Sequence, residues 1–255
     1  MTKRVCLLSV VLFFISCSQK NEKITELSQL NDTRICVLTG SAGDLAARKA
    51  FPDAEFLTMI TASDAAYNIK IGKAAAFVHN KSVLLNIVKK DSGLTIIDSP
   101  VSSVEIAAAF SKENPQLLSE INNALAELIT DGTLKKMKEK WIDSEYQTVP
   151  ELPNIENDFQ NGTLTMGTCA LAEPLTFLYN NKITGFDIEL SLRIGKLLGK
   201  KIEIVDMNFE SLIPALKSGK IDFAFSNFNV TDERKKFVAF STPYLVQDIS
   251  ALVKK

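Results

Sequence analysis

Between residues 33 and 97, short apolar runs alternate with stretches whose apolar residues recur at helical spacing. Strands are predicted at 33–39, 56–60, 74–78 and 95–97. Helices are predicted after the small-residue turn 40–44, at 63–71 and at 81–89. Because strands alternate with helices of this length, the pattern predicts an α/β fold with a parallel sheet.

The alternation breaks once and then resumes. Residues 104–110 are extended and apolar, and two predicted helices follow, the first opened by Asn114-Pro115. Residues 143–162 are polar, contain Pro150 and Pro153 and hold no sustained period, so they predict a linker. Beyond the linker, strands are predicted at 164–169, 201–206 and 249–255, and helices around 188–198 and 209–216. No helix follows the final strand, so we expect it to pair with strands elsewhere in the chain.

A polar turn at 226–234 follows a strand-like alternation and leads into a predicted short helix. Thr231 is placed to cap that helix, and Arg234 falls in its first turn. The helix dipole disfavours a cation there, whereas free N–H groups and a guanidinium together suit a carboxylate. Arg234 is therefore a candidate anion site. The alternative is a solvated arginine paired with Asp232 or Glu233.

Composition limits the classes of function. The 255 residues carry a net charge of −1, and this charge gives no support to nucleic-acid binding. No Cys or His spacing fits a zinc site, so neither metal nor cofactor is expected, and His79 is expected to be structural or at a cleft edge. The turn 40–44 lacks the Gly-Lys-Ser/Thr ending of a nucleotide-binding loop. Cys36 and Cys169 are expected to be two separate, half-buried thiols, although an exported protein is able to pair them.

The first residues have the form of an export signal. A short positive region precedes the apolar run 5–15, which is too short to span a bilayer but has the size of a signal-peptide core. The following Ser16-Cys17 resembles the lipobox of bacterial lipoproteins, although Phe14 stands where that signal usually has Leu. We expect a signal peptide at 1–16, lipidation of Cys17, a tether at 17–27 and a location on the periplasmic side of a bacterial membrane.

Ordered motifs in residues 167–254 resemble a known family. They are Glu-Pro-Leu-Thr-Phe at 173–177, Ile-Thr-Gly-Phe-Asp-Ile-Glu-Leu at 183–190, Gly-Lys-Ile-Asp at 219–222, Val-Thr-Asp-Glu-Arg at 230–234 and Phe-Ser-Thr-Pro-Tyr at 240–244. This stretch resembles the first lobe of type 2 periplasmic solute-binding proteins of the polar amino acid class, also called bacterial extracellular solute-binding proteins, family 3. The pattern is glutamine-binding-protein-like.

The first half resembles the rest of the same family, but the two halves stand in swapped order. The resemblance therefore implies a two-lobe α/β fold that is circularly permuted. It assigns 28–105 to the family's second lobe, 106–142 and 163–255 to its first lobe, and 143–162 to a bridge between the usual termini. We expect one covalent crossover near 104–110, with 249–253 lying beside it. If lobe contacts came only from a second chain, a swapped dimer would replace the permuted monomer.

The resemblance also implies a set of ligand-binding residues. Arg234 matches the arginine that grips a ligand carboxylate, and Phe209 matches an aromatic that packs on the ligand. Asn227 and Asn229 stand where the family has Gly and Thr. Gly40 and Ser41 match the turn that completes the carboxylate grip by N–H and hydroxyl.

Three further positions depart from the family. Asn80 replaces the acidic residue that holds the ligand ammonium, so the charge that selects an amine is missing. Cys169 stands where an acid is often found. Glu173 is the carboxylate left in its loop, and it either serves an amine or faces water.

The leading hypothesis is an exported binding lipoprotein that closes around an amino acid or organic acid and delivers it to an ABC permease, with no catalytic residues. Its membrane contact is the lipid anchor alone. A dehydratase-like enzyme on the same scaffold is one alternative, with Glu173 as its general acid. A ligand sensor or scaffold without transport is the other.

Overall fold

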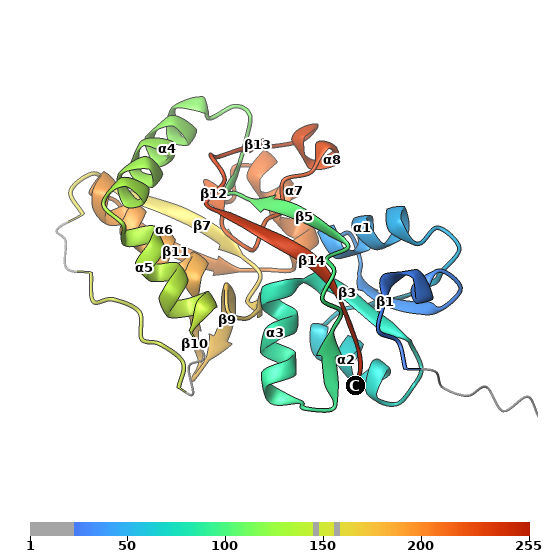
Figure 1. Cartoon of the computed structure of the whole chain (residues 1–255). Coiled ribbons are helices and arrows are strands. Elements are labelled where there is room, and N and C mark those ends of the chain that lie inside the picture. The colour runs from blue at the N-terminus through green and yellow to red at the C-terminus, as the bar shows by residue number, and fades with distance from the viewer. Residues whose placement is uncertain (1–22, 145–147, 156–158) are drawn as a thin grey trace, which may run out of the picture.

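In a computed structural model, which describes residues 23–144, 148–155 and 159–255, the chain forms two lobes (Figure 1). One lobe is built on a six-stranded mixed sheet, and the other on a five-stranded mixed sheet with a three-stranded sheet beside it. We call them the six-stranded lobe and the five-stranded lobe. The predicted signal peptide and Cys17 lie outside the described residues. Within the predicted linker 143–162, the described stretches 148–155 and 159–162 contain no helix or strand, whereas Asp143 ends a π-helical turn.

The six-stranded sheet has the order β2-β1-β3-β14-β4, with β5 paired to β14. Its strands are β1 (Arg34–Leu38), β2 (Glu55–Met59), β3 (Ala76–Asn80), β4 (Leu94–Ile96), β5 (Ser102–Ile106) and β14 (Leu245–Lys254). Its helices are α1 (Ala42–Ala50), α2 (Ala62–Lys70) and α3 (Lys81–Lys90), after a 3-10 turn at Leu27–Leu30. Strands β1 to β3 are parallel, as predicted, but β14 is antiparallel to β3, β4 and β5, which makes the sheet mixed.

The five-stranded sheet has the order β11-β7-β12-β6-β13. Its strands are β6 (Ala109–Phe110), β7 (Thr163–Thr168), β11 (Lys201–Asp206), β12 (Phe223–Ala224) and β13 (Ala239–Phe240). The small sheet joins β8 (Leu171–Ala172), β9 (Thr176–Tyr179) and β10 (Lys182–Thr184). The helices are α4 (Pro115–Thr130), α5 (Thr133–Lys138) with a π-helical turn at Glu139–Asp143, α6 (Phe186–Leu198), a 3-10 turn at Phe209–Ser211, α7 (Leu212–Lys217) and α8 (Asp232–Lys235).

Two strands run side by side between the lobes (Figure 1). One connection passes from β5 to β6, and the other from β13 to β14. The prediction of a single covalent crossover near 104–110 is therefore wrong, because β14 is itself a crossing segment. Its first half pairs with β5, and its second half pairs with β3 and β4. This pairing also places Leu245–Lys254 in the six-stranded sheet. The family resemblance had instead assigned all of 163–255 to the other lobe.

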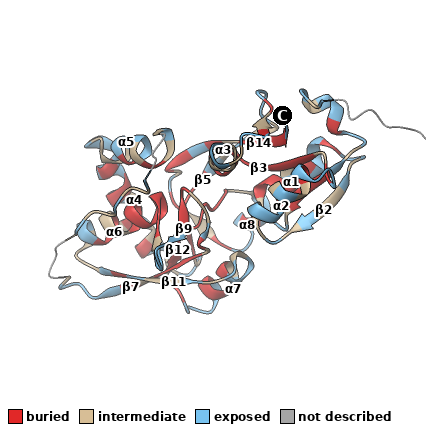
Figure 2. Ribbon diagram, turned by 90° about the horizontal axis from the view of Figure 1, so that it is seen from below, coloured by how far each residue is buried: buried red, intermediate tan, exposed pale blue. Residues whose placement is uncertain are grey.

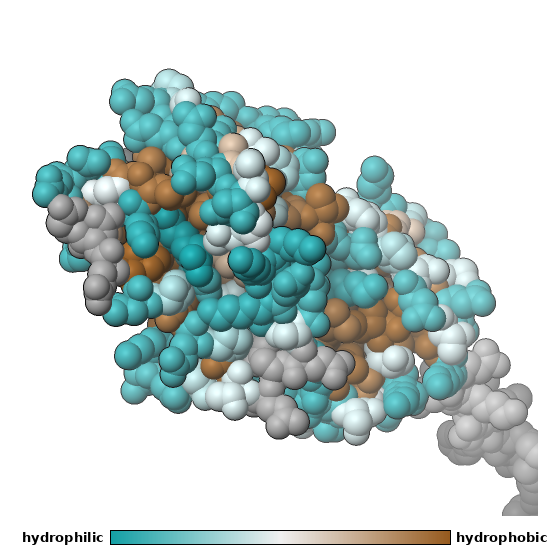
Figure 3. Space-filling view, turned by 60° about the vertical axis from the view of Figure 1, so that its left-hand side comes forward, coloured by the Kyte–Doolittle hydropathy of each residue, from teal (hydrophilic) through white to brown (hydrophobic). Residues whose placement is uncertain are grey.

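Buried residues line the inner faces of the helices and sheets in both lobes, and exposed residues lie on the outside (Figure 2). On the face drawn in Figure 3, hydrophilic residues cover most of the surface and hydrophobic ones gather in separate patches. Among the described residues, no helix has the length and apolar character needed to cross a membrane.

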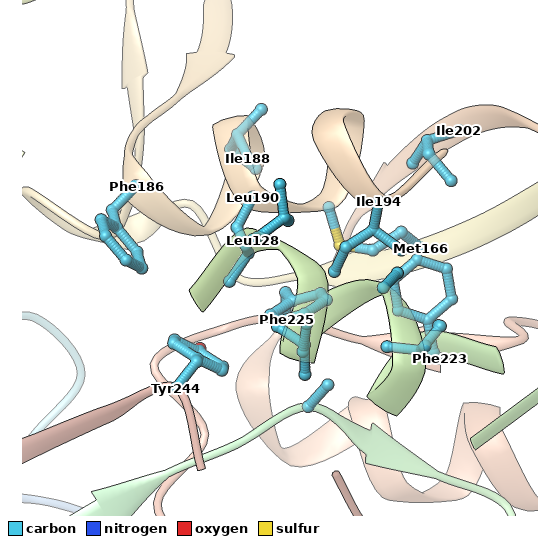
Figure 4. Close-up of a cluster of buried hydrophobic side chains, with 14 of the residues drawn as sticks. Leu128, Met166, Phe186, Ile188, Leu190, Ile194, Ile202, Phe223, Phe225 and Tyr244 are labelled. Atoms are coloured by element: carbon cyan, nitrogen blue, oxygen red, sulfur yellow. The ribbon is translucent and has the colours of Figure 1, made fainter. Parts of the chain in front are cut away.

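The core of the five-stranded lobe joins segments from both halves of the chain. Leu128 of α4 packs with Leu190 and Ile194 of α6, Met166 of β7 and Phe223 of β12 (Figure 4). Because α4 precedes the linker and the other elements follow it, hydrophobic burial holds the two segments together in one lobe.

A buried ionic cluster strengthens the same junction. The Glu189 carboxylate, on α6, accepts hydrogen bonds from Lys140 Nζ at 2.7 Å, Trp141 Nε1 at 2.8 Å and Arg193 Nη2 at 2.7 Å. Burial alone would raise the pKa of Glu189, but these donors outweigh it and lower the pKa. Two cations and one neutral N–H thus donate hydrogen bonds to this buried carboxylate.

Candidate functional site

A cavity of about 280 Å³ lies between the two lobes. The six-stranded lobe lines it with the ends of β1, β2 and β3, with Ser41 before α1, and with residues in the first turns of α2 and α3. The five-stranded lobe lines it with the loops after β7, β11 and β12. These lining segments include Ser41, His79, Asn80, Cys169, Phe209, Asn227 and Asn229. Residues predicted from widely separated parts of the sequence therefore meet at one site.

Arg234 is not among the residues that line the cavity, but it contacts Phe209 and Asn229, which do, and it joins the lobes through Gly40. Thr231 caps α8, as predicted, since its hydroxyl accepts the Arg234 N–H at 3.2 Å. The Arg234 guanidinium donates to the carbonyl of Asn229 at 2.8 Å and to the carbonyl of Gly40, in the other lobe, at 2.8 Å. Its Cζ lies 4.9 Å from the ring centroid of Phe209 and 4.8 Å from that of Phe228. The side chain is thus held by aromatic faces and neutral oxygens.

The charge of Arg234 is not paired with a carboxylate within the part of the chain that the structure describes. The residue is 7% exposed, and burial lowers its pKa to about 10, against a smaller opposing effect of Glu233. A pKa near 10 keeps the guanidinium charged at neutral pH. A buried, unpaired cation is costly unless an anion joins it.

Asn80 and Asn227 meet across the cleft. The Asn80 amide donates to Asn227 Oδ1 at 3.2 Å. Asn227 has a φ of 50°, in the left-handed region that Asn tolerates better than most residues. This conformation directs its N–H to Asp187 Oδ2 at 2.6 Å. The contact between the lobes is therefore built on a turn with a fixed backbone.

Three polar atoms in the cavity wall are buried without a hydrogen-bond partner among the described residues. They are His79 Nδ1, Asn80 Oδ1 and Asn229 Nδ2. Burial lowers the pKa of His79 to about 4, so its ring is neutral at pH 7. Because buried polar groups are nearly always paired in folded proteins, these atoms mark a place for a polar ligand or water.

The turn before α1 differs in detail from the prediction. The N–H of Gly40 is already donated to Asp44 Oδ2 at 3.0 Å, and it is the carbonyl of Gly40 that meets Arg234. In this conformation the Gly40 N–H is therefore not available to bind a ligand carboxylate in the way that the family resemblance implied. Ser41 Oγ accepts the Asp44 N–H at 3.1 Å and keeps its hydroxyl hydrogen for another acceptor. A Cβ at Gly43 would lie 2.3 Å from the Val78 carbonyl, so glycine lets α1 approach β3 here.

Glu173 and Cys169 lie differently from one another. Glu173 does not line the cavity but pairs with Lys90 of the other lobe at 2.5 Å. This pairing gives no support to a general acid at Glu173. Cys169 does line the cavity, and burial raises the pKa of its thiol. Cys169 and Cys36 are both free, in agreement with the expectation of two separate thiols.

A buried pair behind the cavity was not predicted from the sequence. Asp187 Oδ1 accepts the hydroxyl of Tyr244 at 2.9 Å, and Tyr244 directly precedes β14. Burial raises the pKa of Asp187 to about 7 and that of Tyr244 well above its usual value. An aspartate within an apolar helix face, at the motif 183–190, was the signal available in the sequence. Over the described ranges, no group of three or more His, Cys, Asp or Glu is arranged to hold a metal ion.

Two lobes, a cleft lined from both and an unpaired buried cation define a ligand-binding protein. The sequence model of bacterial extracellular solute-binding proteins, family 3, matches residues 19–144 and 164–255. The chain belongs to this family, whose members are binding proteins and not enzymes. Its fold is α/β with two mixed sheets, like the type 2 periplasmic binding proteins.

Several relatives match parts of the chain. The "Probable histidine-binding protein" of Campylobacter jejuni is 48% identical over 82 residues, which cover 32% of this chain and 32% of that protein. The arginine-binding extracellular protein ArtP of Bacillus subtilis is 42% identical over 92 residues, or 36% of each chain. A solved ancestral arginine-binding protein bound to glutamine is 49% identical over 33% of this chain and 38% of that chain, with a TM-score of 0.32. The matched region thus spans about a third of these relatives' length.

Proposed function

We propose that the chain is an extracytoplasmic solute-binding protein that closes its lobes on a small carboxylate-bearing ligand, an amino acid or a related organic acid, for ABC-type import. Membership of the family supports binding outside the cytoplasm. Relatives named for histidine, arginine and cystine binding support a ligand of amino-acid size. An ABC permease is then the expected partner, as for the arginine-binding protein 1 of an Escherichia coli ABC transporter.

The observation that carries this proposal is the buried guanidinium of Arg234 beside the cavity. Among the described residues, its hydrogen-bond acceptors are carbonyl oxygens alone, so a ligand carboxylate is able to supply the missing negative charge. In the proposed site, Arg234 and Ser41 hold the carboxylate and Phe209 packs on the ligand. Asn80, Asn227, Asn229 and Cys169 form the remaining wall. Gly40 and Glu173 contribute to contacts between the lobes.

The test is calorimetric titration of the purified chain with amino acids, dicarboxylates and keto acids. Arg234→Ala is expected to weaken carboxylate binding by about tenfold to a hundredfold, since a charge-assisted pair contributes roughly 1.5–3 kcal/mol. Arg34→Ala is the matched control. Arg34 is the first residue of β1, and it forms an exposed ion pair with Glu55. Equal binding in wild type and Arg234→Ala, or no heat with any carboxylate, would reject the proposal.

We also propose that the family's elements are circularly permuted in one chain, with the lobe assignments inferred from the sequence except for β14. The geometry supports a short connection, because β1 and β14 flank β3 and both Ile35 and Val253 lie opposite Ala76. Two strand spacings separate them, or roughly 10 Å. A rearranged chain that joins Lys255 to Leu27 by a short linker and opens within 143–162 should remain a monomer with unchanged affinity. A domain-swapped dimer would argue against permutation.

A lipid anchor on Cys17 is the last part of the proposal. The Ser16-Cys17 pair after the apolar run 5–15 supports it. Labelling cells with an alkyne fatty acid should tag the wild-type chain and leave Cys17→Ser untagged and released from the membrane fraction. Equal labelling of both would remove the anchor from the account.

A further inference from the structure

We infer that the cleft selects a carboxylic acid whose α substituent is an uncharged hydrogen-bonding group, a 2-hydroxy or 2-oxo acid, over the zwitterionic amino acid of the same shape. This inference rests on the proposed function, since it concerns which carboxylate the same cleft takes. It goes further because it assigns the charge that the ligand is allowed to carry.

The charge of the cavity wall favours a ligand without an ammonium group. The ionisable residues that line it are His79, Cys169 and Glu210. His79 is neutral at pH 7, because burial lowers its pKa to about 4, and burial raises the pKa of the Cys169 thiol. Glu210 is exposed, so its charge is screened by water. Among the described residues, the buried part of the wall therefore contains no carboxylate to pair with an ammonium group.

The balance of buried charge when the lobes close also favours an anion. Arg234 brings one positive charge, and the nearby Glu233 is exposed and makes no ion pair with it. A monoanionic ligand neutralises Arg234 and leaves no net charge. A zwitterion pairs its carboxylate with Arg234 but adds an ammonium with no carboxylate beside it. An unpaired buried charge costs several kcal/mol in proteins, so the anion is favoured.

The carboxylate of Asp187 does not change this balance. It lies behind the cavity wall, and its two oxygens already accept from the Asn227 N–H and the Tyr244 hydroxyl. Burial also raises its pKa to about 7, which reduces its negative charge at neutral pH. Asp44, next to the Gly40 turn, is paired with Arg48 at 2.6 Å.

Two of the residues that line the cavity also hold neutral polar atoms with no hydrogen-bond partner in the described part of the chain. Asn229 Nδ2 is an unpartnered donor and Asn80 Oδ1 an unpartnered acceptor, on opposite lobes and at most 4% exposed. A keto oxygen accepts from the donor, and a hydroxyl is able to bond both. Apolar side chains, Leu38, Met59, Val83 and Phe209 among them, also line the cavity and suit an aliphatic or aromatic tail.

The test compares ligands that share one carbon skeleton. Purified wild-type chain is titrated by calorimetry with L-leucine, α-hydroxyisocaproate and α-ketoisocaproate, and with L-phenylalanine, phenyllactate and phenylpyruvate. We expect the best hydroxy or keto acid to bind at least about tenfold more tightly than its amino acid. L-arginine and L-histidine, which bear further cationic or titratable groups, are expected to bind no better than the amino acids of the series.

A charge substitution sharpens the test. Asn80→Asp places a carboxylate in the wall and should reverse the order, so that the amino acid binds about tenfold more tightly. Asn208→Asp is the matched control, because Asn208 lines the cavity at an exposed position and should leave the order unchanged. Thermal melting checks that each variant folds. If Asn80→Asp does not fold, the ligand series with the wild-type chain alone tests the inference.

The outcomes separate the two claims. Any amino acid that binds wild type as tightly as the matched hydroxy and keto acids overturns this inference and leaves the proposed function in place. Absence of heat with every carboxylate overturns both.

Discussion

Glu189 and Arg234 are both buried charged residues of the five-stranded lobe, but their surroundings are opposite. Glu189 is 1% exposed and accepts hydrogen bonds from two cations and an indole N–H. Arg234 is 7% exposed and donates to two backbone carbonyls, and no carboxylate of the described residues pairs with it. The first charge is balanced inside the protein, and the second is left to be balanced from outside.

The difference separates a charge that holds the fold from one that awaits a ligand. Removing one member of a balanced buried pair leaves its partners buried without a counter-charge, so the free energy of unfolding falls. Removing an unbalanced charge leaves no opposite charge without a partner, so the expected effect is a loss of ligand affinity. The two residues should therefore respond to mutation in opposite ways.

The largest expected effect on stability is at Glu189. Glu189→Ala should lower the free energy of unfolding by about 3 kcal/mol, because Lys140, Arg193 and the Trp141 N–H lose their acceptor. Both cations are about one-third exposed, which limits the cost of leaving them unpaired. Urea unfolding measures the change, and ligand affinity should stay the same. Glu203→Ala, which removes an exposed pair with Lys201, is the control and should cost at most about 1 kcal/mol.

The second prediction concerns two titratable groups of the cleft that oppose each other. Asp187 has its pKa raised to about 7, so the folded state keeps a proton that the unfolded state loses, and stability falls as pH rises through this range. His79 has its pKa lowered from 6.5 to about 4, so its contribution is lost as pH falls through that window. Between about pH 4 and 6.5 the two effects should cancel.

Single substitutions should reveal how each group changes the free energy of unfolding with pH, relative to wild type. In His79→Gln, stability should fall by about 1.4 kcal/mol per pH unit as pH rises from 4 towards 7. In Asp187→Asn, it should rise by about the same amount per unit between pH 4 and 6.5. Urea unfolding at several pH values measures both. Slopes in the two variants that match wild type would show that these groups titrate alike in the folded and unfolded states.

The smallest expected effect is at the ion pair between the lobes. Lys90 is 65% exposed and Glu173 is 22% exposed on their side chains. Lys90→Ala should weaken ligand binding about twofold to fivefold, mainly through faster release, since exposed pairs contribute at most about 1 kcal/mol. Stopped-flow fluorescence at low and high salt measures the release rate. A loss as large as that of Arg234→Ala would mean that this pair, and not the unbalanced arginine, controls closure.

Local features of the fold were predictable from the sequence. The strand at 33–39 and the cap at Thr231 depend on short patterns of apolar residues and hydroxyls. The meeting of Arg234 with the Gly40 turn came from the family resemblance, since these residues are 194 positions apart.

Non-local pairing accounts for what was not predictable. The strand at the end of the chain was expected, but its length from Leu245 and its role as a second crossing depend on β5, far away in sequence. The same holds for the bond between Asp187 and Tyr244, 57 residues apart. At Gly40, a competing acceptor on Asp44 takes the N–H, which only the folded turn reveals.

The central claim is that the charge of Arg234 is completed by a ligand carboxylate, and a crystal structure of the chain with a bound carboxylate tests it most directly. The account predicts a carboxylate oxygen within hydrogen-bonding distance of the Arg234 guanidinium, with the Glu189 cluster unchanged. A ligand bound away from Arg234, with the guanidinium still donating only to the carbonyls of Asn229 and Gly40, would contradict it.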